Sequence, residues 1–188
     1  MFWKKRIYLD YAAGVSGNPS SPHEEGRHAK KILEGARTVI ARLAEVQSDD
    51  IIFTSGATES NALAILGHMR ALKAGGRKDI HILYLPSAHA SIVENVKLLQ
   101  AYGVAVEALP IKEYRVDTEA LSKILRSGTA LVSMDAVCGE TGVVWNTREV
   151  AQVLHAHAPQ VLLHVDASQA PLTEKISRAH FGADMLTF

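Results

Sequence analysis

Three turns of this 188-residue chain carry residue types that can hold and orient a ligand. In the first, residues 55–58 (SGAT), small residues precede a helical pattern and leave backbone N–H groups free to bind an anion. The second turn ends in His89, and the third begins with Asp166 directly after the apolar run 161–165. Together they offer an anion site, a ring that can stack and a carboxylate that can pair with a cationic nitrogen. A phosphorylated aromatic cofactor would satisfy all three.

Each turn also has an ordinary structural interpretation. Residues 55–58 are typical of a plain helix N-terminus in which Thr58 bonds within its own helix, and on spacing alone this interpretation is preferred. A single histidine such as His89 is more often a capping or surface residue than a functional one. Asp166 is about equally well placed as a helix cap. A carboxylate after an apolar strand is nevertheless partly desolvated and needs a cationic or N–H partner.

The elements that must position these turns alternate along the chain. Short β-branched or aliphatic runs predict strands at 51–54, 80–85, 104–109, 130–134, 161–165 and 184–188. Helical spacing predicts helices over 28–43, 59–73, 91–101, 118–125 and 147–157. This alternation predicts an α/β fold with a mainly parallel sheet sandwiched by helices. Ligands bind outside the carboxyl ends of the strands in such a sheet, where all three turns fall.

The composition excludes several classes of protein. Twenty Lys and Arg balance 20 Asp and Glu, so a nonspecific binder of nucleic acid or of an anionic membrane is not expected. With 47% hydrophobic and 21% charged residues the chain is an ordinary globular one, expected to be soluble and cytoplasmic. Cys138 is the only cysteine, which excludes an internal disulfide and a cysteine-based zinc site, and no metal is expected.

Six segments carry a resemblance to a known family. They are IYLDYAA (7–13), GNPSSPH (17–23), DIIFTSGATESNALAILG (50–67), SAHASIVE (87–94), GETGVV (139–144) and HVDASQ (164–169). In order and spacing they resemble the cysteine desulfurases of the class V aminotransferase group, pyridoxal-phosphate enzymes of fold type I. The resemblance implies that residues 1–188 are one incomplete cofactor-binding large domain, truncated before the small C-terminal domain.

The resemblance also implies a role for each site residue. Ala57 and Thr58 would bind the phosphate of pyridoxal 5'-phosphate, and His89 would stack on the pyridine ring and relay protons. Asp166 would pair with the pyridinium nitrogen, which strengthens the cofactor as an electron sink, and Gln169 would hydrogen-bond the ring's phenolic oxygen.

Four departures from the family pattern stand against these matches. Only three residues join Ala13 to Gly17, where the family has a helix. Gly139 stands where the family has an asparagine that contacts the cofactor. The family's Ser-x-His-Lys motif, whose lysine binds the cofactor covalently, follows a strand like 184–188, and this sequence ends at Phe188. Cys138 does not match the family's sulfur-accepting loop cysteine and is expected to be a small buried residue.

The expected function is therefore that of the N-terminal part of a cysteine desulfurase. The complete enzyme would remove sulfur from L-cysteine and leave alanine and an enzyme-bound persulfide, for sulfur transfer and iron–sulfur cluster assembly. Expected partners are a second copy in a homodimer or a complementing C-terminal chain, and a sulfur-acceptor protein. The alternatives are another class V enzyme, such as a selenocysteine lyase, and a non-catalytic scaffold. The chain alone is expected to be inactive.

Overall fold

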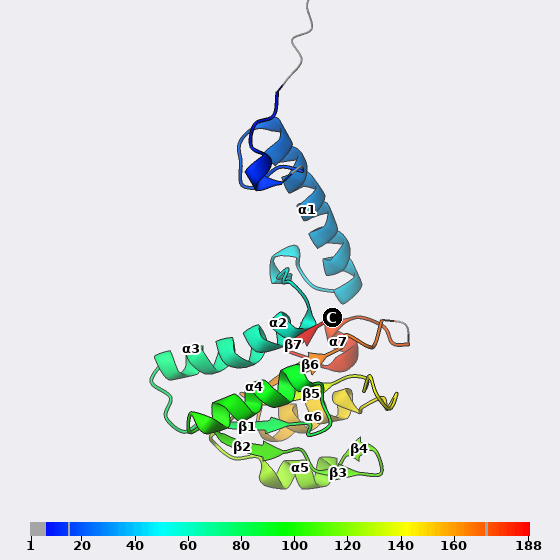
Figure 1. Cartoon of the computed structure of the whole chain (residues 1–188). Helices are drawn as coiled ribbons and strands as arrows, with labels where there is room; N and C mark the ends of the chain where they lie inside the picture. Colours follow the sequence, from blue (N-terminus) through cyan, green and yellow to red (C-terminus); the bar gives the residue numbers. More distant parts are fainter. Residues whose placement is uncertain (1–6, 15, 172) are drawn as a thin grey trace, which may run out of the picture. The chain divides into compact units, whose positions relative to one another are not determined.

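The computed structural model of the chain describes residues 7–14, 16–171 and 173–188. These residues divide into an N-terminal unit that ends at Ile52 and a sheet-bearing unit that begins at Phe53 (Figure 1). The single-domain organisation predicted from the sequence stays a prediction.

The sheet-bearing unit is built on five parallel strands (Figure 1). In spatial order these are β2 (Ala105–Ala108), β1 (His81–Tyr84), β5 (Thr129–Asp135), β6 (Leu162–Asp166) and β7 (Met185–Thr187). A separate antiparallel pair is formed by β3 (Ile111–Lys112) and β4 (Arg115–Val116). The predicted α/β fold with a mainly parallel sheet is confirmed. The short pair was not predicted, because two-residue strands are too short to show a period.

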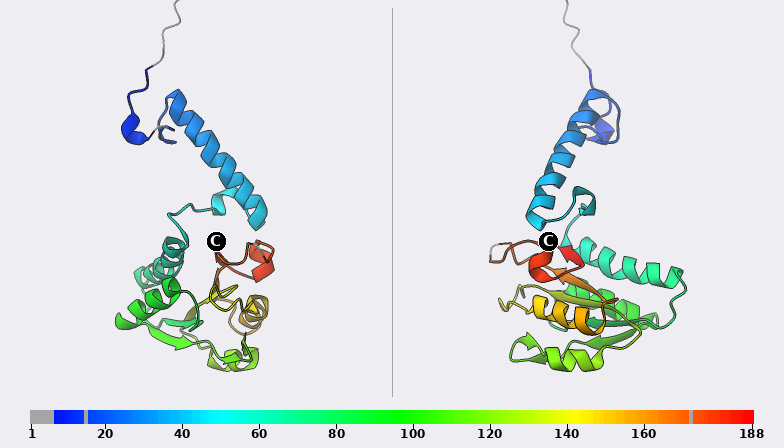
Figure 2. Two further views of the ribbon diagram at one scale, coloured as in Figure 1. Left: turned by 45° about the vertical axis from the view of Figure 1, so that its right-hand side comes forward. Right: turned by 180° about the vertical axis from the view of Figure 1, so that it is seen from behind.

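Helices cover both faces of this sheet (Figures 1 and 2). One face is covered by α2 (Ala57–Ala62), the π-helical turn η3 (Leu63–Gly67), α3 (His68–Ala74) and α4 (Ala90–Ala101). The other is covered by α5 (Thr118–Ile124), α6 (Thr147–His157) and α7 (Arg178–Phe181). No helix in the described part of the chain is long and apolar enough to cross a membrane.

Alternation along the strands divides the core into two apolar clusters. Ile82 and Leu131 pack toward η3, α3 and α4, whereas Leu83 and Val132 pack toward α5, α6 and α7. All of β5 is buried, because it is the central strand and helices cover it on both sides. The last residues of β5 and β6 are therefore held on a rigid frame.

The strand predicted over residues 51–54 is wrong. These residues form no strand in the structure, and Ile52 and Phe53 are 69% and 42% exposed. A strand needs a neighbouring strand to accept its backbone hydrogen bonds, and none pairs with this run among the described residues. The other five predicted strands and all five predicted helices are present, with shifts at their ends.

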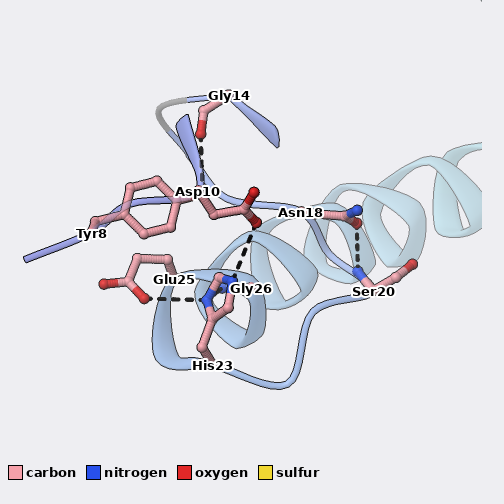
Figure 3. A network of polar contacts seen from close by, with 8 residues as sticks. All are labelled: Tyr8, Asp10, Gly14, Asn18, Ser20, His23, Glu25 and Gly26. Atoms are coloured by element: carbon pink, nitrogen blue, oxygen red, sulfur yellow. Dashed lines mark hydrogen bonds and ion pairs between the residues drawn. The ribbon is translucent and has the colours of Figure 1, made fainter. Parts of the chain in front are cut away.

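The N-terminal unit consists of η1 (Tyr11–Ala13), α1 (Glu24–Ala44) and η2 (Ser48–Asp50). Helix α1 begins four residues before the predicted start at 28, because the Nδ1 atom of His23 caps it by accepting the Gly26 N–H at 3.1 Å (Figure 3). The Nε2 atom of the same ring lies 3.6 Å from Asp10 Oδ2. A Cβ atom at Gly26 would lie 2.3 Å from the Ser21 carbonyl oxygen, so this turn requires glycine.

Candidate functional site

A cavity of about 540 Å³ lies where β5 and β6 end. Its volume is within the range of small-molecule sites. All five site residues predicted from the sequence lie on its wall, namely Ala57, Thr58, His89, Asp166 and Gln169. They come from the start of α2, the turn before α4 and the segment after β6. The roles assigned to them stay predictions.

The turn before α2 presents the N-terminus of a helix to the cavity. Gly56 adopts a φ of +154° just before α2, and no side chain among the described residues caps the first N–H groups of that helix. The Thr58 side chain makes no hydrogen bond to the described residues, so the bond within its own helix is not observed. Glu59 turns back and accepts the Ser55 N–H and hydroxyl, each at 2.6 Å. These bonds lower the pKa of Glu59, the hydroxyl bond contributing most.

Asp166 is 6% exposed and is held by two different partners. Its Oδ1 accepts the Ser168 N–H at 2.9 Å and the Ser168 hydroxyl, and its Oδ2 accepts the side-chain amide of Asn61 at 2.5 Å. No helix begins directly after Asp166, so the interpretation as a helix cap is wrong. The sequence reasoning missed Asn61. The available signal was a polar residue on the side of a helix that faces the sheet.

His89 both caps a helix and lines the cavity. Its Nδ1 accepts the Ser91 N–H at 3.2 Å at the start of α4 and lies 2.7 Å from the Ser91 hydroxyl oxygen. Its own backbone N–H donates to Asp135 Oδ2 at 3.1 Å. The capping interpretation of His89 and its place on the cavity wall are therefore compatible.

Asp135 is a cavity residue that the sequence reasoning missed. It is the last residue of β5, is 5% exposed and lies in register with Asp166 on β6. Burial raises the pKa of Asp135 to about 7, the nearby charge of Asp166 adds to the rise, and the His89 N–H opposes it. The predicted strand stopped at 134, one residue short of a carboxylate that ends its strand as Asp166 does.

Replacing Asp135 with asparagine should flatten the pH dependence of stability. The folded chain keeps the Asp135 proton up to about pH 7, whereas the unfolded chain loses it near the ordinary pKa of 3.8. The stability that this proton contributes is therefore lost as pH rises from about 4 to 7. Asp135→Asn should raise the free energy of unfolding at pH 8 by about 4 kcal/mol, and the difference should vanish at pH 4.

Urea unfolding at pH 4, 6 and 8 measures this difference. Asp117→Asn is the matched control, because it removes one carboxylate at the cap of α5, away from the cavity, and keeps a capping residue. Equal gains from Asp135→Asn at all three pH values would contradict the prediction.

Gly139 shapes the wall beside Gln169. A Cβ atom at Gly139 would lie 3.3 Å from Gln169 Cγ, closer than most such contacts in proteins, and 3.5 Å from its Cδ, an ordinary contact distance. The Gln169 side chain thus fills space that a residue at 139 would need. The departure from the family's asparagine leaves this part of the wall lined by Gln169.

The cavity wall is poor in cations. No lysine or arginine of the described residues lines it. Among the residues that the structure describes, no group of three or more His, Cys, Asp or Glu side chains is arranged to hold a metal ion. Any anion would therefore be held by backbone N–H groups and hydroxyls rather than by a cationic side chain.

Comparison with known proteins gives consistent matches. Residues 6–188 match the family described as aminotransferase class-V. The chain is 37% identical over 180 residues to cysteine desulfurase IscS 1 of Archaeoglobus fulgidus, covering 95% of this chain and 46% of that protein. It is 33% identical to cysteine desulfurase IscS of Dictyoglomus turgidum, covering 98% of this chain and 50% of that one.

Solved structures agree with these sequence matches. A NifS-like protein superimposes with a TM-score of 0.86 at 28% identity, covering 94% of this chain and 48% of that one. A structure described as SspA in complex with cysteine gives a TM-score of 0.82 at 26% identity, covering 94% and 50%. The chain thus spans about half the length of the relatives it matches.

Proposed function

Because the chain belongs to the class-V aminotransferase family, we propose that its cavity binds pyridoxal phosphate as the N-terminal part of a cysteine desulfurase. The observation that carries the proposal is the meeting of five predicted residues, from three separate segments, on the wall of one cavity. The volume of the cavity and the buried carboxylate at its wall suit a planar, cationic ring with a phosphate group.

Different residues of the chain would bind different groups of the cofactor. The first N–H groups of α2, at Ala57 and Thr58, would bind the phosphate, and the Thr58 hydroxyl would add a donor. Asp166 offers its buried carboxylate to a protonated ring nitrogen. His89 would cover the ring, and Gln169 would offer an amide to its oxygen. Pyridoxal phosphate, when bound, supplies an electron sink for bond cleavage at the substrate's Cα.

The proposal extends to the substrate and partners of the complete protein. The name cysteine desulfurase among the relatives supports L-cysteine as substrate. Alanine and a persulfide are the products that we propose for the complete protein. We propose that the complete protein forms a homodimer or pairs with a complementing C-terminal chain. We also propose that it passes sulfur to an acceptor protein and has a role in iron–sulfur cluster assembly. A cytoplasmic location is supported by the single buried cysteine, which needs no oxidising compartment.

Cofactor binding should protect Cys138 from alkylation. Cys138 is the only thiol of the chain, is 6% exposed and lies on the cavity wall. A hydrogen bond with the Thr141 side chain lowers the pKa of the Cys138 thiol, which increases the reactive thiolate fraction at neutral pH. Saturating pyridoxal phosphate should slow labelling by iodoacetamide at least about tenfold, as measured by mass spectrometry of the intact chain.

Pyridoxal without its phosphate is the matched control ligand. It should protect much less at equal concentration, because it lacks the anion that the α2 N-terminus would bind. An unchanged labelling rate with pyridoxal phosphate at concentrations up to the millimolar range would contradict the proposed function.

A further inference from the structure

Four side chains beside the cavity form an unbroken line of polar contacts. The amide nitrogen of Asn61 donates to Asp166 Oδ2 at 2.5 Å and to the Ser91 hydroxyl oxygen at 2.8 Å. That hydroxyl oxygen lies 2.7 Å from His89 Nδ1. Asn61 is fully buried, and Ser91 and Asp166 are 8% and 6% exposed, so the two contacts of Asn61 are shielded from water, whereas the His89 ring belongs to an exposed residue. The line joins α2 to the end of β6 and to the start of α4.

The direction of each hydrogen bond is set at the two ends of the line. An ionised carboxylate only accepts, so Asn61 must present its NH₂ group rather than its carbonyl oxygen to Asp166. A backbone N–H only donates, so His89 Nδ1 is the acceptor of the Ser91 N–H at 3.2 Å and carries no proton. The Ser91 hydroxyl must then donate to Nδ1 and accept from Asn61.

The buried oxygen of Asn61 supports this orientation of the amide. Asn61 Oδ1 has no hydrogen-bond partner within the described residues. Rotating the amide by half a turn would place this oxygen against the carboxylate of Asp166 and the lone pairs of Ser91. The unpartnered oxygen is therefore explained by the demand of both neighbours for a donor.

We propose that Asn61 and Ser91 are positioning residues that hold His89 as the neutral tautomer with its proton on Nε2. His89 lies on the cavity wall, and its Nε2 has no partner among the residues that the structure describes. An imidazole in this tautomer presents a hydrogen-bond donor at Nε2 and not a base. The consequence of this tautomer for catalysis rests on the proposed function. In the resting site His89 would donate a hydrogen bond to the ligand, and removing a substrate proton would fall to another group.

Nitrogen-15 NMR of the ligand-free chain tests the tautomer directly. The chain would be labelled at its nine histidines and recorded at alkaline pH, where histidine is neutral, with His89→Gln to assign the signal. We expect Nδ1 of His89 to be unprotonated and Nε2 protonated. Ser91→Ala removes the hydroxyl but keeps the backbone N–H, so the Nδ1-protonated form should rise about fivefold. Ser91→Thr keeps a hydroxyl and should restore the native signal.

Ser133→Ala is the matched control. Ser133 Oγ lies 2.8 Å from Nδ1 of the buried His164, so this variant should change the His164 signal and leave that of His89 unchanged. Asn61→Ala should shift His89 in the same direction as Ser91→Ala. Should Asn61→Ala fail to fold, Ser91→Ala decides alone.

Each outcome bears on one of the two proposals. A native chain with a proton on Nδ1 of His89, or a Ser91→Ala chain with an unchanged signal, would overturn the inference. A fixed tautomer in a chain whose Cys138 is not protected by pyridoxal phosphate would support the inference and contradict the proposed function instead.

Discussion

The Thr58→Glu chain should bind pyridoxal phosphate at least about 100-fold more weakly than the native chain. Thr58 is the second residue of α2 and lies on the cavity wall, where the proposed phosphate would meet the helix N-terminus. Two like unit charges about 4 Å apart near a protein surface repel by about 4 kcal/mol, which exceeds the 2.7 kcal/mol needed for a hundredfold effect. Fluorescence titration with the cofactor measures the dissociation constant.

Thr118→Glu is the control for this substitution. Thr118 is the first residue of α5, so the variant places the same charge at the start of another helix, outside the cavity. It should leave cofactor affinity unchanged, while Thr58→Ala should weaken binding only severalfold because the backbone N–H groups remain. If Thr58→Glu and Thr118→Glu bind equally well, the phosphate site is misassigned.

The 188-residue chain alone should release no alanine from L-cysteine and acquire no borohydride-stable cofactor label. A covalent bond between cofactor and protein needs an unprotonated lysine amine at the cavity, and no described lysine lies there. Lys97 is paired with Glu94 at 2.7 Å, and this hydrogen bond raises the pKa of Lys97, which keeps the amine protonated. Lys123 is held in the same way by Glu119. Alanine analysis and mass spectrometry after reduction measure both results.

Adding a lysine-bearing C-terminal segment from a relative provides the positive control for this experiment. Alanine release that requires both pieces would support a desulfurase completed by further sequence. Cofactor binding without activity in either case would favour the scaffold alternative. Catalytic alanine release by the chain alone, with one lysine labelled stoichiometrically, would contradict the prediction.

The sequence predicted the sheet because its strands are buried on both faces. Runs such as 130–134 and 161–165 are almost wholly apolar, and that composition needs no knowledge of neighbouring strands. Residues 51–54 have a similar apolar composition, but the run itself does not show whether another strand is available to pair with it. His89, Asp166 and Gln169 lie together because the carboxyl ends of parallel strands share one edge of a sheet. Ala57 and Thr58 follow no strand and line the same cavity from the start of α2.

The partners that hold these residues could not be predicted from local patterns. Asn61 contacts Asp166 across 105 positions of the chain, and Asp135 bonds to the backbone of a residue 46 positions earlier. Hydrophobic periodicity identifies the face on which a residue lies, but not the polar atom that it meets there. The pKa of Asp135 depends on burial and on a neighbouring strand, both of which arise only on folding.

The close approach of Gln169 to Gly139 couples two positions of the cavity wall. With a Cβ atom at 139 placed 3.3 Å from Gln169 Cγ, either residue limits what the other can become. An asparagine introduced at 139 would require the Gln169 side chain to shift by a few tenths of an ångström. This is epistasis with a steric cause: the effect of a substitution at one of these two positions should depend on the side chain at the other.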